Sequence, residues 1–312
     1  MDNWRISKGS SNESIISGVN LLMLTYPLNG LLMIALPLVL AVYLTRKFHL
    51  SWGLWGIGGV TFIVSQVAHI PFNLLWLNPR LAQLSGSSLP EPLPWLLIAL
   101  ALGLSAGLFE ETARYAMYRW WAKEARSWAK GLLAGAGHGG FEAVILGALV
   151  LLAFLQLLAI RNTDLAEIVP PEQLELAQAQ VSAYWTAEWS ETLLGALERA
   201  FSLAFHLSAS VLVLQAFTRK QIGWLGLAIA WHALLDASAV IASRYLNSYL
   251  TEALIGIFAL LSLGIIFRLR QPEPLELTEQ EYAPLPSPLS AISLHPVEEN
   301  EVNLEKSRYD PN

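Results

Sequence analysis

Seven long apolar stretches are the feature of this 312-residue sequence that most restricts its fold. Each is close to the roughly 20 residues that a helix needs to cross the hydrocarbon core of a bilayer. Only 14% of the residues are charged, whereas a soluble domain carries roughly 25%. The sequence therefore predicts an all-α membrane bundle of about seven transmembrane helices. The stretches cover residues 15–44, 53–77, 95–118, 131–160, 193–217, 222–243 and 250–267.

The pattern of polar and apolar residues divides the chain into three parts. Residues 1–14 form a polar N-terminal segment, and residues 15–268 form the transmembrane domain. Residues 269–312 are rich in proline and acids, cannot bury a core, and are predicted to be disordered. Within the membrane domain, the acidic loop 161–191 has apolar residues at helical spacing, which predicts an amphipathic helix lying along the outer interface.

The basic residues of the loops predict how the chain is oriented. They follow the first, third, fifth and seventh stretches, at Arg46, Lys47, Arg119, Lys123, Arg126, Lys130, Arg219, Lys220, Arg268 and Arg270. Because short cytoplasmic loops carry the excess of Lys and Arg, the N-terminus is predicted outside and the C-terminus in the cytoplasm, typical of a bacterial plasma-membrane protein. The chain has no cysteine, which excludes disulfides and thiolate metal sites. Nothing in the sequence indicates nucleic-acid binding.

Ionisable side chains inside the apolar stretches are the candidates for function. A charge at the bilayer centre costs about 2.5–3.5 kcal/mol, so these groups need partners or a wet cavity. Counted from the cytoplasmic ends at about 1.5 Å per residue, four of the stretches bring polar groups to depths of roughly 11–17 Å, while His69 comes out deeper, at roughly 24 Å. The candidates are Glu110, Glu111, Arg114, His138, Glu142, His206, His232 and Asp236.

Spacing supports a common site for these residues. Glu110 and Arg114, like His138 and Glu142, are four residues apart and share a helix face, as do His232 and Asp236. The glycines around His138 permit close helix packing, and also a local unwinding of that helix. Singly, each feature is explained as well by a structural ion pair or a packed histidine, but their convergence favours a functional site.

Two kinds of hydrolytic chemistry suit these side chains. A carboxylate and an imidazole that share a water form a general base, and a second histidine can donate to an oxyanion. Alternatively, Glu110 with the histidines His138, His206 and His232 can hold a zinc ion that activates water. The residues are equally compatible with zinc and with a metal-free glutamate mechanism.

The motifs FEETARY (109–115), HGGFEA (138–143) and WHALLDASAV (231–240) resemble those of the YhfC family of intramembrane metalloproteases, over roughly residues 20–268. Glu-Glu-x-x-Arg, a histidine on the next span and His-x-x-x-Asp also resemble the wider superfamily of CAAX proteases and bacteriocin-processing enzymes, which includes the Rce1-type endopeptidases. The resemblance implies that Glu110 activates water, with Glu111 and Arg114 positioning it. It also implies that His138 shares that water and that His232 is the oxyanion donor.

Asp236 is counted with the catalytic residues, whereas Glu142 and His206 have supporting roles. Asp236 is expected to accept a hydrogen bond from His232, while His206 and Glu142 support the site. The resulting hypothesis is an intramembrane endopeptidase that cuts a membrane protein or a lipidated peptide. A proton- or ion-coupled transporter, with the same groups as a relay, and a non-catalytic membrane scaffold are the alternatives.

Overall fold

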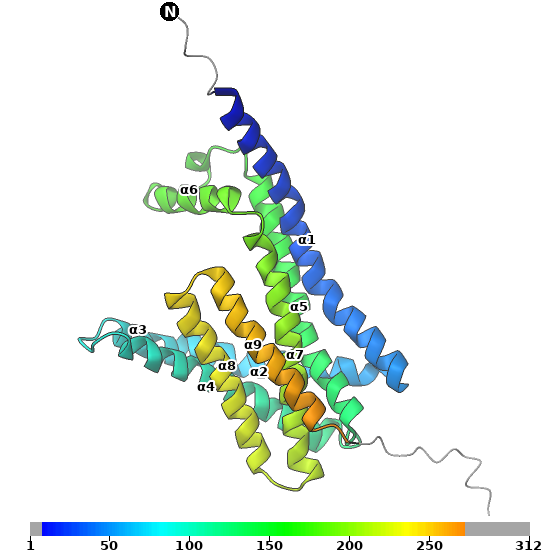
Figure 1. Ribbon diagram of the computed structural model, residues 1–312. Coiled ribbons are helices and arrows are strands. Elements are labelled where there is room, and N and C mark those ends of the chain that lie inside the picture. Colours follow the sequence, from blue (N-terminus) through cyan, green and yellow to red (C-terminus); the bar gives the residue numbers. More distant parts are fainter. Residues whose placement is uncertain (1–7, 272–312) are drawn as a thin grey trace, which may run out of the picture. The chain divides into compact units, whose positions relative to one another are not determined.

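The computed structural model describes residues 8–271, with side chains from residue 21 onward, and every long element among them is a helix (Figure 1). Most of the predicted tail (residues 272–312) and half of the predicted N-terminal segment (residues 1–7) lie outside the described residues. The α-helices are α1 (Lys8–Phe48), α2 (Trp52–Phe72), α3 (Asn78–Ser85), α4 (Leu93–Ala116), α5 (Trp128–Ala159), α6 (Pro171–Thr186), α7 (Leu194–Thr218), α8 (Gly223–Tyr245) and α9 (Ser248–Arg268).

The prediction of an all-α bundle with seven spans is confirmed for the described residues. Seven helical segments there are long and apolar enough to cross a membrane. The second runs over 52–85, further than predicted, because the π-helical segment Asn73–Leu77 joins α2 to α3 without a break. A helix is present within the predicted range 161–191 as α6, and Trp189 lies beyond its end and is exposed.

Local sequence sets where several helices begin. The side chain of Ser51 accepts a hydrogen bond from the backbone N–H of Gly53 at the start of α2. Asn247 accepts from the N–H of Leu250 at 2.9 Å and begins α9. Such caps satisfy the N–H groups that have no partner in the first turn of a helix.

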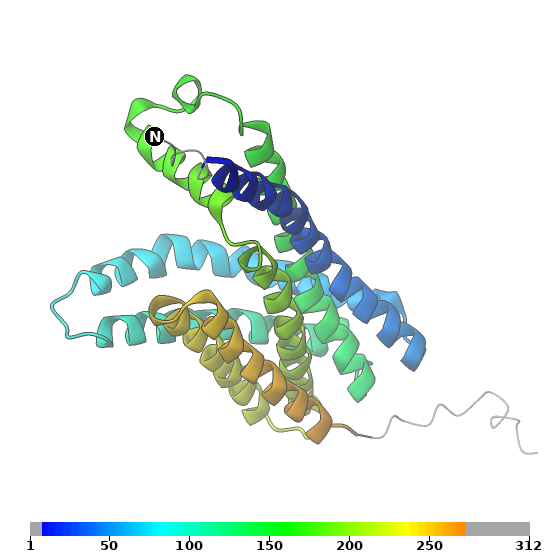
Figure 2. The same cartoon turned by 45° about the horizontal axis from the view of Figure 1, so that its top comes forward.

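Helices α5 and α7 form the centre of the bundle. Helix α5 packs against α1, α2 and α7, and α7 also contacts α4, α8 and α9 (Figures 1 and 2). Most of α7 between Leu203 and Ala216 is buried, including polar residues such as Ser208 and Gln215. Polar groups on α5 and α7 are therefore shielded from lipid by the surrounding helices.

One end of the bundle, here called the basic end, holds the loops with the basic residues. The indole N–H of Trp128, at the start of α5, donates to the carbonyl of Ile266 in α9 at 2.9 Å. In the loop between α4 and α5, Arg126 donates to the carbonyl of Tyr118 at 2.8 Å and stacks over the ring of Phe217 in α7. The ends of α4, α7 and α9 and the start of α5 thus lie together.

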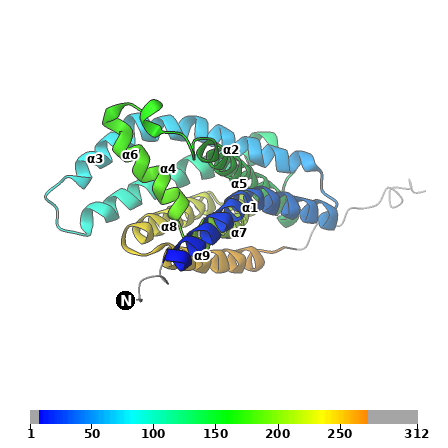
Figure 3. The same ribbon diagram turned by 90° about the horizontal axis from the view of Figure 1, so that it is seen from above.

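The opposite end, here called the α6 end, gathers the other connections. The hydroxyl of Tyr245, at the end of α8, donates to Glu91 in the α3–α4 loop at 2.8 Å. The ring of Tyr184 in α6 stacks on Tyr26 of α1 with centroids 3.9 Å apart, and burial raises the pKa of Tyr184. Figure 3 shows the chain from this side, with α6 in front of the spans. The two ends match the alternation of basic and non-basic loops.

Candidate active site

Glycines in α4 bring the three ionisable residues of that helix against α8. A Cβ atom at Gly103 would lie 2.4 Å from the carbonyl oxygen of Ala233, and one at Gly107 would lie 2.7 Å from that of Ile229. No side chain fits at either position, so the two helices touch along their backbones. Glu110 and Glu111, one turn further along α4, are buried there.

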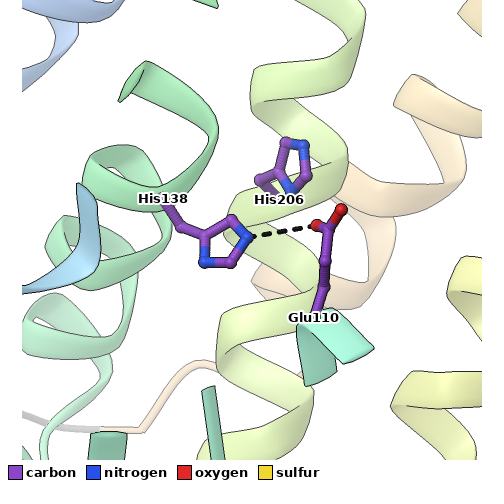
Figure 4. Close-up of side chains that lie close together, drawn as sticks. All are labelled: Glu110, His138 and His206. Atoms are coloured by element: carbon purple, nitrogen blue, oxygen red, sulfur yellow. Dashed lines mark hydrogen bonds and ion pairs between the residues drawn. The ribbon is translucent and has the colours of Figure 1, made fainter. Parts of the chain in front are cut away.

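Glu110 is held by donors from two other helices. Its Oε1 accepts a hydrogen bond from the side-chain amide of Gln66 in α2 at 3.0 Å. Its Oε2 lies 3.1 Å from Nε2 of His138 in α5, as Figure 4 shows. His138 is 1% exposed and its Nδ1 has no partner among the described residues, so Nε2 is the nitrogen that meets the carboxylate.

Arg114 and Glu111 form a second buried contact on α4. The guanidinium Nη1 bonds Oε1 of Glu111, and both side chains are almost fully buried. The same oxygen lies 2.7 Å from Nδ1 of His232 in α8. Because a carboxylate only accepts, Nδ1 of His232 carries the hydrogen of that bond, and Nε2 faces Asp236, whose Oδ2 is 3.5 Å away.

The hydrogen bonds around His206 fix which of its nitrogens carries a proton. Its Nδ1 lies 2.6 Å from Nη2 of Arg114, and a guanidinium can only donate. Nδ1 is therefore the acceptor, and Nε2–H donates to Oε2 of Glu142 at 2.8 Å. The other oxygen of Glu142 accepts from Arg199, which also bonds the neighbouring Glu198. His206 thus joins the α4 charges to a second ion-pair group on α5 and α7.

Small residues on α5 make this convergence possible. A Cβ atom at Gly139 would fall 2.5 Å from the ring of His206, and one at Gly137 would fall 2.0 Å from the carbonyl oxygen of Trp55 in α2. The predicted close approach of helices is thus present on two sides of α5. The unwinding suggested around His138 is absent, because α5 is a continuous helix from Trp128 to Ala159. The glycines therefore permit close packing and do not bend the helix.

A cavity of about 120 Å³ reaches the cluster, which is room for several water molecules. Glu110, His206, His232 and Asp236 face it, together with Glu142 and residues of α7 and α9. Glu110, with 7% of its surface exposed, is therefore in reach of water although it lies inside a bundle of apolar helices.

A metal ion has a suitable set of donors here. One ligand atom each of Glu110, His138 and His206 lies within 4.8 Å of the others (Figure 4). Two imidazoles and a glutamate are a ligand set of catalytic zinc. Carboxylates outnumber guanidinium groups in the cluster, which also favours a divalent cation. To bind it, His206 would have to release Arg114 or Glu142. His232, the fourth predicted ligand, falls outside this group.

The structure brings together all eight predicted site residues, but in partly different pairs. Glu142 bonds His206 and Arg199 rather than His138, and Arg114 bonds Glu111 while lying 4.0 Å from Glu110. His69, the predicted outlier, stacks on Phe109, the residue next to Glu110, and bonds Asn73.

Sequence reasoning missed three residues: Gln66, Glu198 and Arg199. Gln66 is a polar residue in an apolar span, which was the available signal. Glu198 and Arg199 lie only one turn inside the α7 span, where charges are common at helix ends.

Over the described residues 8–271, fold and site together define a membrane protein of seven apolar helices with a buried cluster of carboxylates and imidazoles at the level where α4, α5, α7 and α8 meet. Comparison with known proteins places it more closely: residues 32–267 match the sequence model of the YhfC intramembrane metalloproteases, and the chain belongs to this family. It is 30% identical over 259 residues to the uncharacterized membrane protein YhfC of Bacillus subtilis (strain 168), an alignment that covers 78% of this chain and 95% of the relative. No solved structure matches the chain significantly.

Proposed function

We propose that this protein is an intramembrane endopeptidase that hydrolyses a peptide bond of a membrane protein or lipidated peptide in a bacterial plasma membrane. The observation that carries the proposal is Glu110: a carboxylate inside an apolar bundle, oriented by Gln66 and His138, at the wall of a cavity large enough for water. A general base must be in reach of the proton it takes and held in one orientation. The family name supports the same reaction class.

In the proposed reaction, Glu110 takes a proton from a water molecule in the cavity while the water oxygen attacks the carbonyl carbon of the substrate. The C=O electron pair moves onto the oxygen, which becomes an oxyanion. Glu110 then gives the proton to the leaving nitrogen, the C–N bond breaks, and a carboxylic acid and an amine are formed. His138, 3.1 Å from Oε2, keeps the carboxylate and its water in place.

His232 is suited to stabilise the oxyanion. Its Nδ1–H is held by Glu111 at 2.7 Å, which fixes the ring and turns Nε2 toward the cavity. Nε2 lies 4.0 Å from Oε2 of Glu110, so the proposed oxyanion donor and the proposed base are close enough to act on one carbonyl group. In this role Nε2 carries a proton, and the Asp236 carboxylate at 3.5 Å favours it. Arg114 holds Glu111 and His206 in place from the other side.

Glu110, His138 and His206 would hold a metal, and the ion would then supply polarisation of water or of the substrate carbonyl. Elemental analysis of the purified protein separates the two mechanisms. About one zinc per chain that is lost in His138→Ala and retained in a His49→Ala control would establish the metal enzyme. Zinc below that level in active protein would establish the glutamate base.

The order of the motifs along α4, α5 and α8 also supports our proposal that the family is related to the CAAX proteases and bacteriocin-processing enzymes. In both, a Glu-Glu-x-x-Arg helix would supply the base and a later helix the oxyanion donor. This relationship predicts a substrate cut within or beside the bilayer.

The function can be tested by mass spectrometry of new protein N-termini in membranes. The membranes come from cells that express wild type or Glu110→Gln at equal levels. The amide keeps the size of Glu110 but cannot take a proton, so we expect cleavage sites that appear with wild type to vanish. Glu124→Gln, an exposed residue of the α4–α5 loop, is the matched control and should cleave like wild type. Identical termini from wild type and Glu110→Gln, with both proteins folded, would leave transport or a scaffold as the function.

A further inference from the structure

A second cavity, here called the vestibule, lies between α8 and α9 beside the cavity of the active site. Its volume is about 450 Å³. Glu198, Ala239 and Ile255 line both cavities, so the vestibule adjoins the one that Glu110 faces. It therefore has the position of an access route to the site.

The vestibule opens at the α6 end of the bundle. Ser243 and Ser248, on either side of the turn between α8 and α9, line it and are exposed. Next to this turn, the hydroxyl of Tyr249 lies 2.7 Å from that of Ser190, in the segment that follows α6. Glu110 and His138, in contrast, lie in the halves of α4 and α5 that are nearer the basic end, and His206 lies at the middle of α7. The route thus runs to the site from the far side of the bundle.

Glu252, which lines the vestibule, has an unpaired carboxylate oxygen. Glu252 of α9 is only 9% exposed, and its Oε2 is buried without a hydrogen-bond partner among the described residues. The hydroxyl of the adjacent Thr251 is also buried and unpartnered. A buried acceptor without a donor costs free energy, and a bound donor recovers it. Arg199, which lines the adjoining cavity of the active site, is already bonded to Glu142 and Glu198.

The unpaired carboxylate oxygen of Glu252 is better suited to an organic cation than to a metal ion. Glu198 and Glu252 are the ionisable residues of the vestibule wall, and two carboxylates do not make a metal site. Within residues 8–271, the one group of three or more side chains placed to hold an ion is Glu110, His138 and His206. A lysine or arginine side chain, in contrast, needs one or two carboxylates and brings its own donors.

We propose that the vestibule is the access route for substrate and binds a lysine or arginine side chain of the substrate through Glu252 and Glu198. This inference rests on the proposed function. The polypeptide would reach the active site from the α6 end, and its basic residue would remain in the vestibule while a bond a few residues away meets Glu110. The site would then prefer cleavage near a basic residue.

Access can be tested without any cleavage, because the chain has no cysteine. Ala239→Cys lies where the two cavities meet, and we expect a small membrane-impermeant thiol reagent to label it from the same side that labels Asn162→Cys, an exposed residue beyond α5. Lys123→Cys shows from which side the reagent reaches the basic end. Leu234→Cys, on α8 but 52% exposed outside both cavities, should stay unlabelled in lipid. No labelling of Ala239→Cys, or labelling only from the Lys123 side, would overturn the route.

Specificity can be tested by comparing which amino acids surround the cleavage sites, counting only the sites that are lost in Glu110→Gln. We expect Lys and Arg to be enriched severalfold at one position near the cut in wild type, the enrichment to be lost in Glu252→Gln, and Glu252→Lys to favour acidic residues instead. Unchanged preferences in these variants, with Glu110-dependent cleavage intact, would refute the vestibule as a basic subsite. Absence of any Glu110-dependent cleavage would instead refute the proposed function, while the labelling result would stand.

Discussion

Arg114 is the side chain on which the buried charges of the site depend most. It is 1% exposed, bonds Glu111 and His206, and lies 4.0 Å from Glu110. Removing one partner of a buried ion pair leaves an uncompensated charge, which costs about 3–5 kcal/mol. We therefore expect Arg114→Gln to lower the free energy of unfolding in detergent by about that amount, measured by denaturant titration.

The exposed Arg119→Gln, in the same helical segment, provides the control and should change stability by about 0.5 kcal/mol or less. The double variant Glu111→Gln/Arg114→Gln removes both charges and should recover part of the loss. If Arg114→Gln unfolds like wild type, the ion pair contributes no stability and the buried charges are compensated in another way.

Eight residues of the candidate site were predictable from sequence, but Gln66, Glu198 and Arg199 were not, and neither was the pairing of the side chains. A carboxylate or a histidine inside an apolar span is visible in a single sequence, and so is helical spacing. Spacing, however, only indicates which residues share a face of the same helix. Glu142 of α5 instead bonds His206 and Arg199, which lie on α7. Which residues meet across helices depends on how the helices are rotated, and sequence alone does not determine this.

At the scale of elements, close contact between α5 and α2 depends on Gly137. A Cβ atom there would lie 2.0 Å from the backbone carbonyl oxygen of Trp55, which cannot move without shifting α2. Overpacking of this kind typically costs about 1–3 kcal/mol. We expect Gly137→Ala to lower the thermal unfolding midpoint and, by moving α5, to reduce cleavage as well.

Gly264→Ala on α9 is the matched control, since a Cβ atom there meets nothing within 4 Å. Alanine is the better helix former by roughly 0.5–1 kcal/mol, so this variant should be as stable as wild type or slightly more stable. Equal midpoints for the two variants would show that α2 and α5 are not in the tight contact described.

The helices themselves were the most predictable level of this structure. Apolar length alone located all seven spans within the described residues, because backbone groups in lipid must be satisfied within the helix. Their ends were less predictable: the second stretch was predicted to end at residue 77, whereas α2 continues through a π-helical segment to the end of α3. The cavity between α8 and α9 had no signal in the sequence, since it results from the packing of whole helices.

At the scale of the whole molecule, the collection of basic loops at one end predicts that this end faces the cytoplasm. Asn162→Cys at the α6 end should then react with a membrane-impermeant thiol reagent in intact cells, and Lys123→Cys only after the membrane is permeabilised. Both residues are exposed, so equal reactivity in permeabilised cells is the control. Combined with a vestibule that opens at the α6 end, this orientation predicts that the proposed substrates would reach Glu110 from outside the cell, although Glu110 itself would lie nearer the cytoplasmic ends of the helices. The reverse labelling pattern would mean that the vestibule opens toward the cytoplasm and that substrates enter from there.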